Sequence, residues 1–232
     1  SSGSLLNIAV GKYGNFTADD VRFVASAGAD YGAIVVRADS RFDNLGALMR
    51  ALKTAPGGVL IGAGGSIGSQ DWVKGALLMQ AAGSLPKSMR YVAFDGGGEA
   101  ISNLISGNID VYTGDISELR AHVNAGKMRV LAVLADKRLP APFQNVPTAK
   151  EQGVDVNWTL FRGFYMGKNV SDADYQFYAD AFAAAYKTPE FARIREEHGL
   201  YEFSLSGQAF HNHVIRQVKV LRELVTSAGL VP

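Results

Sequence analysis

Residues 59–72 read VLIGAGGSIGSQDW, an apolar run followed by a loop of Gly and Ser and then by residues typical of a helix start. We predict a strand, a loop and a helix. Such a loop directs backbone N–H groups and the positive end of a helix dipole toward one point, so it binds an anion without a basic side chain. Four of the seven residues from 62 to 68 are Gly, which is more freedom than a plain turn requires.

Length and composition exclude several classes of protein. The 232 residues suffice for one large domain or two lobes, and the hydrophobic (47%) and charged (19%) contents are those of a globular protein. A net charge of +1, with acids and bases interleaved, gives no basic stripe for nucleic acid. The chain has no Cys, which excludes disulfides and thiol chemistry, and its four His have no metal-site spacing. We therefore expect no metal and no cofactor.

The middle of the chain alternates strands with helices. Apolar runs predict strands, and apolar residues at helical spacing, closed by Pro or Gly, predict helices between them. This alternation is typical of an α/β protein whose mostly parallel sheet carries helices on both faces. The predicted strands are 59–61, 90–94, 109–112 and 128–134, and the predicted helices are 45–52, 72–79, 101–105 and 116–123.

The two ends of the chain follow a different pattern. Capping motifs at Thr148, Ser171 and Thr188 predict helix starts, and a last helix carries apolar residues from 210 to 225. Segments 21–24 and 32–36 are predicted as strands that lack a sheet of their own, so we expect the two ends to pack together. Residues 1–4 are set aside as a flexible end.

The spacing of Gly and Lys around the loop shows whether it fits the known phosphate-binding motifs. A P-loop needs a Lys after its last Gly, and none follows Gly68. The dinucleotide-binding fingerprint G-x-G-x-x-G needs a third Gly at position 67, where this chain has Ile67. Carboxylate capture by amides and by the Ser66 and Ser69 hydroxyls needs no further motif. A tight turn without a ligand remains the structural alternative, and a nucleotide- or phosphate-binding enzyme remains the functional one.

Several blocks together resemble the substrate-binding receptors of the tripartite tricarboxylate transporter family. The blocks are 62–71, 94–100 (FDGGGEA), 107–111 (GNIDV), 125–133 (AGKMRVLAV), Lys137-Arg138, 145–148 (NVPT) and Gly153-Val154. The resemblance runs from about residue 25 to the C-terminus. It implies an extracytoplasmic receptor of the type II periplasmic-binding-protein fold, in which two α/β lobes close on a small carboxylate. Such a receptor is not an enzyme and delivers its ligand to membrane subunits of the transporter.

The resemblance also implies the site. It implies that residues 63–69 form the carboxylate-binding loop of the second lobe. Asp115 stands where the family often has an Asp-Asn pair facing the cleft. Phe161 and Arg162, on the segment that returns to the first lobe, would form a wall of the ligand cleft. An ionised Asp115 would repel a ligand carboxylate unless it met a hydroxyl, an amine or water. The predicted ligand-binding residues are Ala63, Gly64, Gly65, Ser66, Gly68, Ser69, Asp115, Phe161 and Arg162.

The resemblance fixes the expected organisation as well. We expect a second lobe at 37–157 and a first lobe made of 1–36 and 158–232. The family's opening strand and Gly-rich loop are not found in this sequence, so the first lobe is expected to be incomplete. The expected ligand is a di- or tricarboxylate, citrate-like as a first choice, and the expected location is the periplasm.

Overall fold

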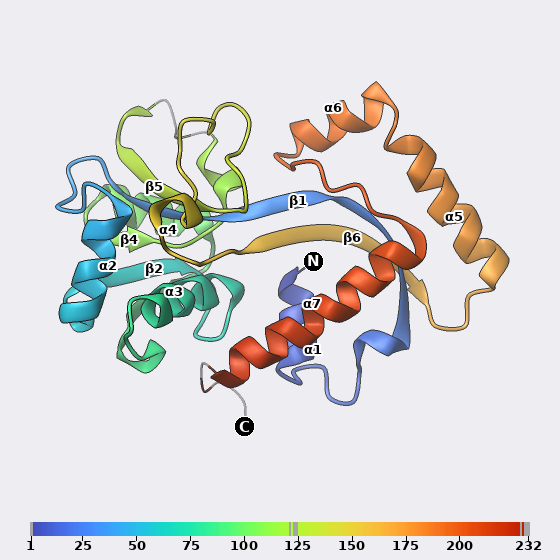
Figure 1. The fold of residues 1–232 in the computed structure, drawn as a ribbon, viewed down its shortest axis with the longest axis horizontal. Helices are drawn as coiled ribbons and strands as arrows, with labels where there is room; N and C mark the ends of the chain where they lie inside the picture. The colour runs from blue at the N-terminus through green and yellow to red at the C-terminus, as the bar shows by residue number, and fades with distance from the viewer. Residues whose placement is uncertain (1, 121, 123–124, 228, 230–232) are drawn as a thin grey trace. The chain divides into compact units, whose positions relative to one another are not determined.

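The computed structural model describes residues 2–120, 122, 125–227 and 229, and the chain divides into two compact units (Figure 1). Unit 1 contains Ser1–Asp30 and Leu160–Pro232, and unit 2 contains Tyr31–Thr159. Among the described residues, no helix is long and apolar enough to cross a membrane.

Unit 2 is built on a mixed sheet of order β3-β2-β4-β1-β5. The strands are β1 (Val21–Arg37), β2 (Leu60–Gly64), β3 (Arg90–Phe94), β4 (Val111–Tyr112) and β5 (Met128–Leu134). The alternation of strands and helices is confirmed, and β2 pairs in parallel with β3 and β4 as predicted. The sheet is less parallel than expected because β1 runs antiparallel to β4 and β5.

The helices of unit 2 follow the predicted apolar spacing. They are α2 (Leu45–Thr54), α3 (Gln70–Ala81) and α4 (Gly97–Ile105), with 3-10 turns η2 (Pro56–Gly58), η3 (Pro86–Ser88), η4 (Ile116–Leu119) and η6 (Lys150–Gln152). Leu45, Leu48 and Leu52 of α2 are fully buried, as an amphipathic stripe requires. The predicted helix 116–123 is only the turn η4 at its start, and its residues 121 and 123 lie outside the described part of the chain.

The two short strands predicted near the N-terminus are one strand. β1 is continuous from Val21 to Arg37 and pairs with β4, β5 and β6 (Thr159–Gly167), which runs beside it in Figure 1. The sequence suggests a break because residues 25–30, ASAGAD, are weak strand formers. Backbone pairing overrides that weakness: Ala29 and Tyr201 exchange N–H···O bonds of 3.0 and 2.8 Å. The expectation that these strands lacked a sheet was therefore wrong.

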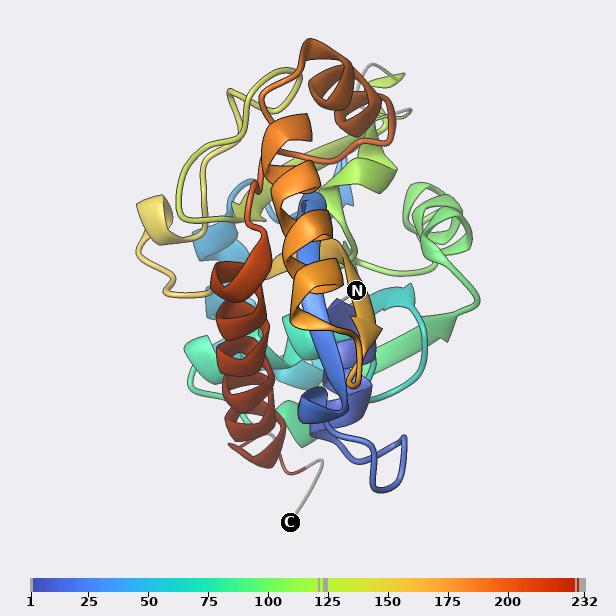
Figure 2. The same cartoon turned by 90° about the vertical axis from the view of Figure 1, so that its right-hand side faces the viewer.

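Unit 1 surrounds its part of β1 and β6 with helices. They are α1 (Ser2–Ala9), α5 (Asp172–Ala185), α6 (Pro189–Glu197) and α7 (Gly207–Ser227), with the turn η1 (Ala18–Asp20). Figure 2 shows α5 lying in front of β1, and Tyr175 and Ala179 of α5 pack on Val24 and Ala25 of β1. The residues set aside at the N-terminus belong in part to α1, whose Leu5 and Leu6 are buried.

The predicted helix caps are confirmed. Ser171 accepts from the Asp174 N–H at 3.0 Å to begin α5, and Thr188 accepts from the Phe191 N–H at 3.2 Å to begin α6. Thr148 and Glu151 bond each other's backbone N–H groups at 2.8 and 3.0 Å, the reciprocal pattern of a capping box.

Candidate functional site

The carboxyl ends of three neighbouring strands meet at one edge of unit 2. β3, β2 and β4 run parallel, so the segments that follow them leave the sheet on the same side. The Gly65 N–H donates to Phe94 O at 2.8 Å, and the Thr113 hydroxyl donates to Asp71 O at 3.1 Å. This edge is where open α/β sheets bind their ligands.

The Gly/Ser loop begins α3 as predicted. Gly65 and Gly68 have φ of 80° and 84°, a left-handed conformation that favours Gly. The Ser69 hydroxyl caps α3 by accepting from the Trp72 N–H at 3.3 Å, and it donates to Gly64 O at 3.3 Å. Ser69 is therefore engaged in holding the loop, whereas the Ser66 side chain is exposed.

Some of the loop's amides are already used. The Gly65 N–H donates to Phe94 O, and the Ser69 N–H donates to Ser66 O at 2.9 Å. Within the described part of the chain, the N–H groups of residues 66, 67 and 68 donate to no protein acceptor, and Ile67 is 65% exposed. The amides that remain for an anion are therefore those of the loop's tip and of the first turn of α3.

Tyr91 holds the loop from β3, a role that was not predicted from the sequence. Its hydroxyl donates to Gly65 O at 3.1 Å. Burial raises the pKa of Tyr91 to about 12, so the phenol stays protonated and keeps its donor at neutral pH. The only sequence signal was a Tyr in a strand, which has no distinctive spacing.

A buried charged cluster lies directly behind the loop. Lys74 of α3 has a side chain that is 0% exposed, and its Nζ lies 2.5 Å from Asp115 Oδ1 and 2.8 Å from Asp71 Oδ1. Gln70 donates from Nε2 to Asp115 Oδ2 at 3.3 Å. The Asp115 carboxylate is therefore paired with a lysine ammonium of the protein itself.

Burial and charge set the protonation of this cluster. Burial raises the pKa of Asp71 to about 6 against the attraction of Lys74, and the negative charge of Asp115 adds to the rise. Burial alone would lower the pKa of Lys74, but the carboxylates of Asp115 and Asp71 outweigh it and hold the pKa above its ordinary value. Two carboxylates therefore share one ammonium at neutral pH.

The backbone leaves room for the lysine. A Cβ on Gly32 of β1 would lie 2.7 Å from Lys74 Cδ, so only Gly fits there. Beyond the lysine, the Tyr112 hydroxyl donates to Glu118, and burial, followed by the charge of Glu118, raises the pKa of Tyr112. Lys74 was not predicted as part of the site, because a single Lys in a helix ordinarily points to solvent.

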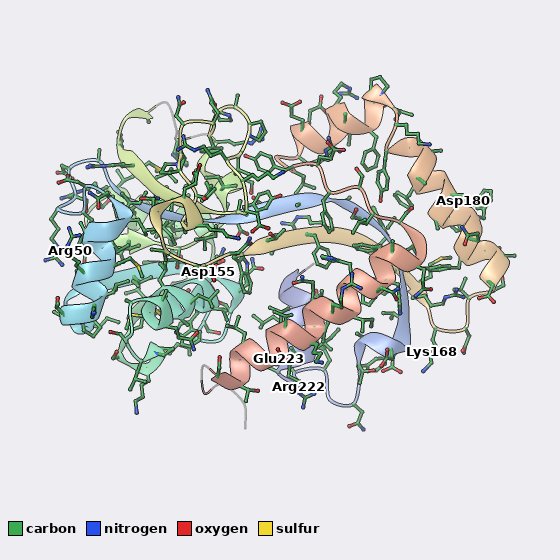
Figure 3. The ribbon with its side chains drawn as sticks, in the orientation of Figure 1. Arg50, Asp155, Lys168, Asp180, Arg222 and Glu223 are labelled. Carbon is green, nitrogen blue, oxygen red and sulfur yellow. The ribbon has the colours of Figure 1, made fainter. Side chains whose placement is uncertain are left out.

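Many of the other charged side chains lie on the surface. Figure 3 labels Arg50 and Asp155 of unit 2 and Lys168, Asp180, Arg222 and Glu223 of unit 1, all of them exposed. In the part of the chain that the structure describes, no group of His, Asp and Glu is arranged to hold a metal ion.

The predicted site residues fall in both units. Residues 63–66, 68–69 and Asp115 lie at the carboxyl edge of unit 2, whereas Phe161 and Arg162 belong to unit 1. Phe161 is buried, and its ring contacts Phe203 and Phe210 at centroid distances of 5.8 and 5.6 Å. Arg162 is exposed. A ligand-binding role for all nine residues stays a prediction.

Comparison with known proteins identifies the family. The sequence matches the tripartite tricarboxylate transporter family receptor over residues 12–230, and the chain belongs to this family. A UPF0065 protein of Cupriavidus necator is 24% identical over 212 residues, which are 91% of this chain and 63% of that protein. The chain therefore spans less than two thirds of this relative.

Solved structures share the fold. A TctC solute-binding protein from Polaromonas has a TM-score of 0.80 at 23% identity, covering 96% of this chain and 75% of that one. MatC from Rhodopseudomonas palustris with bound malate has a TM-score of 0.75 at 17% identity, covering 97% and 76%. The periplasmic-binding-protein architecture of type II, expected from the resemblance, is confirmed.

Proposed function

We propose that the chain is part of a receptor that captures a small carboxylate at the carboxyl edge of unit 2. The observation that carries the proposal is the loop 64–69, which presents the N–H groups of residues 66–68 at the N-terminus of α3. Backbone donors and a helix dipole together stabilise a carboxylate without a cationic side chain. Lys74 is fully buried between two carboxylates, so it does not serve as the anchor.

Family membership supports the biological setting of this proposal. We place the receptor in the periplasm, where it would pass its ligand to the membrane subunits of a tripartite transporter, and we propose that it catalyses no reaction. The related structure of MatC holds malate, which supports a di- or tricarboxylate ligand. A citrate-like acid remains the first candidate from the sequence.

Thermal unfolding of the 232-residue chain tests the proposal. Succinate, malate or citrate at about 100 times its Kd should raise the free energy of unfolding by about 3 kcal/mol, and Tm by about 5–10 °C. The alternative, a nucleotide- or phosphate-binding enzyme, predicts a rise with ATP or phosphate instead. If carboxylates give no rise at any concentration while ATP does, the receptor proposal is wrong.

A loop variant locates the binding. Gly65→Val places a side chain at a left-handed φ and brings its Cβ to 2.9 Å from Ser69 Cβ, so we expect carboxylate binding to be lost while circular dichroism shows a folded protein. The control is Gly153→Val, which has a similar φ of 78° and open space around its Cβ. Both variants place a Val at a left-handed φ and so carry similar backbone strain, but only Gly65→Val alters the proposed binding loop. Equal affinity in the two variants would rule out the loop as the site.

A further inference from the structure

Unit 1 contains two neighbouring cavities that the proposed capture at unit 2 does not use. The first, of about 560 Å³, is lined by residues of α1, β1, β6 and α7. The second, of about 540 Å³, is lined by the segment 8–19 and by α7. Ile8, Phe16 and Thr17 line both, so the two cavities adjoin. They lie where α1 and α7 pack on one another (Figure 1), and each has the size of a small-molecule site.

The first cavity is apolar, and none of its described lining residues is charged. Its walls include buried side chains: Leu5 is 3% exposed, Phe161 is 4% exposed and Phe210 is 0% exposed. Two further lining rings, Phe16 and Tyr165, are 67% and 66% exposed and are free to cover an apolar ligand. The cavity therefore suits a hydrocarbon tail. It does not suit a di- or tricarboxylate, because burying an unpaired charge is costly.

The second cavity adds positive charge. Its lining includes Lys219 and Arg222 of α7, both exposed, and Figure 3 labels Arg222. Within the described part of the chain, neither side chain is in an ion pair. Asp19 also lines this cavity, so two cations face one carboxylate and leave a net positive charge. An anionic group is attracted to this end.

The two cavities follow one another along α7. Phe210 lines the first, and Lys219 and Arg222 stand about 14–18 Å further along the helix axis at 1.5 Å per residue. The α7 residues that line the second cavity before these cations, Ile215 and Val218, are apolar. One extended molecule with an apolar tail and an anionic end therefore matches both cavities.

We propose that unit 1 binds a long-chain carboxylic acid, with its hydrocarbon tail in the first cavity and its carboxylate at Lys219 and Arg222. Apolar area removed from water supplies most of the affinity, and the two exposed cations supply orientation and a smaller share. The buried walls favour a single tail, because a membrane surface contacts exposed side chains only. The site lies in unit 1, so this inference does not depend on the function proposed for the loop of unit 2.

Three probes test the two halves of the site. Dodecanoate has the tail and the anion, butyrate lacks most of the tail, and dodecyltrimethylammonium has the tail with the opposite charge. Calorimetry of the 232-residue chain, below the micelle concentrations, should show the tightest binding for dodecanoate. We expect at least about a hundredfold gap to butyrate, since each buried methylene contributes roughly fourfold. Absence of dodecanoate binding, or equal binding of the two dodecyl probes, would overturn the proposal.

A matched pair of aromatic variants tests the place of the tail. Phe16→Ala removes a lining ring that is 67% exposed, and Phe177→Ala removes a ring of α5 that is 68% exposed and lines neither cavity. We expect dodecanoate binding to weaken about tenfold in the first and to stay unchanged in the second. Ile8→Trp, which fills the space where the cavities adjoin, should weaken it as well. Wild-type affinity in both folded Phe16→Ala and folded Ile8→Trp would rule out this site.

A second pair of variants tests the place of the carboxylate. Replacing both Lys219 and Arg222 with Ser should weaken dodecanoate binding about two- to tenfold and remove most of its dependence on salt. The control replaces the exposed Lys53 and Lys187 with Ser, which gives the same net charge and should keep the wild-type affinity. Unchanged affinity and salt dependence in the first variant would contradict the assignment.

Other occupants of the cavities give different results. A dimer in sedimentation that Phe16→Ala dissociates and dodecanoate does not would assign the cavities to a second copy. Binding to phosphatidylglycerol vesicles without competition from dodecanoate would assign them to a membrane, and either result overturns the proposal. Gly65→Val, in the loop of unit 2, should leave dodecanoate binding intact, so a failure of citrate and malate to bind does not affect this inference. Loss of dodecanoate binding in folded Gly65→Val would move the acid to the loop and overturn the site.

Discussion

The Asp71 carboxyl group titrates near pH 6 in the folded chain, well above an unfolded Asp, because it is buried. From about pH 4 to pH 6 the folded state therefore holds a proton that the unfolded state has lost. The free energy of unfolding therefore falls as pH rises through this window, and above about pH 6 the full penalty of burying the ionised carboxylate is present.

Asp71→Asn should therefore stabilise the protein at pH 8, by up to about 3 kcal/mol for a shift of about two pKa units. The gain should be mostly lost at pH 4, where the wild-type carboxyl is protonated in the folded state and about half protonated in the unfolded state. Urea unfolding at the two pH values measures the difference, with Asp155→Asn as the exposed control. A less stable Asp71→Asn at pH 8 would mean that the attraction of Lys74 exceeds the cost of burial.

Lys74→Met should have the opposite effect. The substitution leaves Asp71 and Asp115 buried without their ammonium, and breaking such a pair costs about 3–5 kcal/mol. Lys87→Met, an exposed lysine of the same unit, should stay within about 0.5 kcal/mol of the wild type. Urea unfolding at pH 7 measures both losses. A loss below about 1 kcal/mol for Lys74→Met would show that the ion pair contributes little.

At the scale of elements, local chemistry sets where helices begin. α5 begins at Ser171, whose hydroxyl accepts from the Asp174 N–H, and α3 begins at Ser69 in the same way. The Ser171 cap was predicted from the sequence, because the hydroxyl and the N–H that it accepts from lie three residues apart. The Ser69 cap was not predicted, because the Ser69 hydroxyl was assigned to the ligand.

Ser171→Ala should lower the free energy of unfolding by about 1 kcal/mol through loss of the N-cap. Ser102→Ala, in the exposed middle of α4, is the control and should be neutral or slightly stabilising, since Ala is the better helix former. Chemical denaturation of both variants checks this. Equal stabilities would mean that packing alone fixes the start of α5.

At the scale of the whole molecule, β1 is shared by the two compact units. Residues up to Asp30 belong to unit 1, and those from Tyr31 belong to unit 2. Its residues 33–36 are 0% exposed and pair with β5. Opening this part of the strand disrupts the sheet of unit 2, so its amides should exchange only on extensive unfolding.

Hydrogen exchange should therefore show the slowest amides at residues 33–36 and fast exchange at residues 11–16, which are exposed. The strand β3, at the edge of the sheet order, provides the internal comparison and should exchange at an intermediate rate. Exchange of residues 33–36 as fast as that of β3 would contradict a central place for β1.

The sequence by itself determined the features that depend on neighbours along the chain. β3 and β5 have the bounds that their apolar runs predict, the Gly/Ser loop begins a helix, and the three caps form as their spacing indicates. Each of these depends on residues within a few positions of one another, where backbone geometry and hydrogen-bond reach are fixed locally.

The tertiary structure alone decided what depends on distant segments. It joined the weak strand formers of 25–30 into β1 through pairing with Tyr201, and it brought Lys74 to Asp115, 41 residues away. It also turned the Tyr91 hydroxyl onto Gly65. A sequence pattern does not carry these contacts, because burial and charge pairing are set by which segments meet once the sheet has formed.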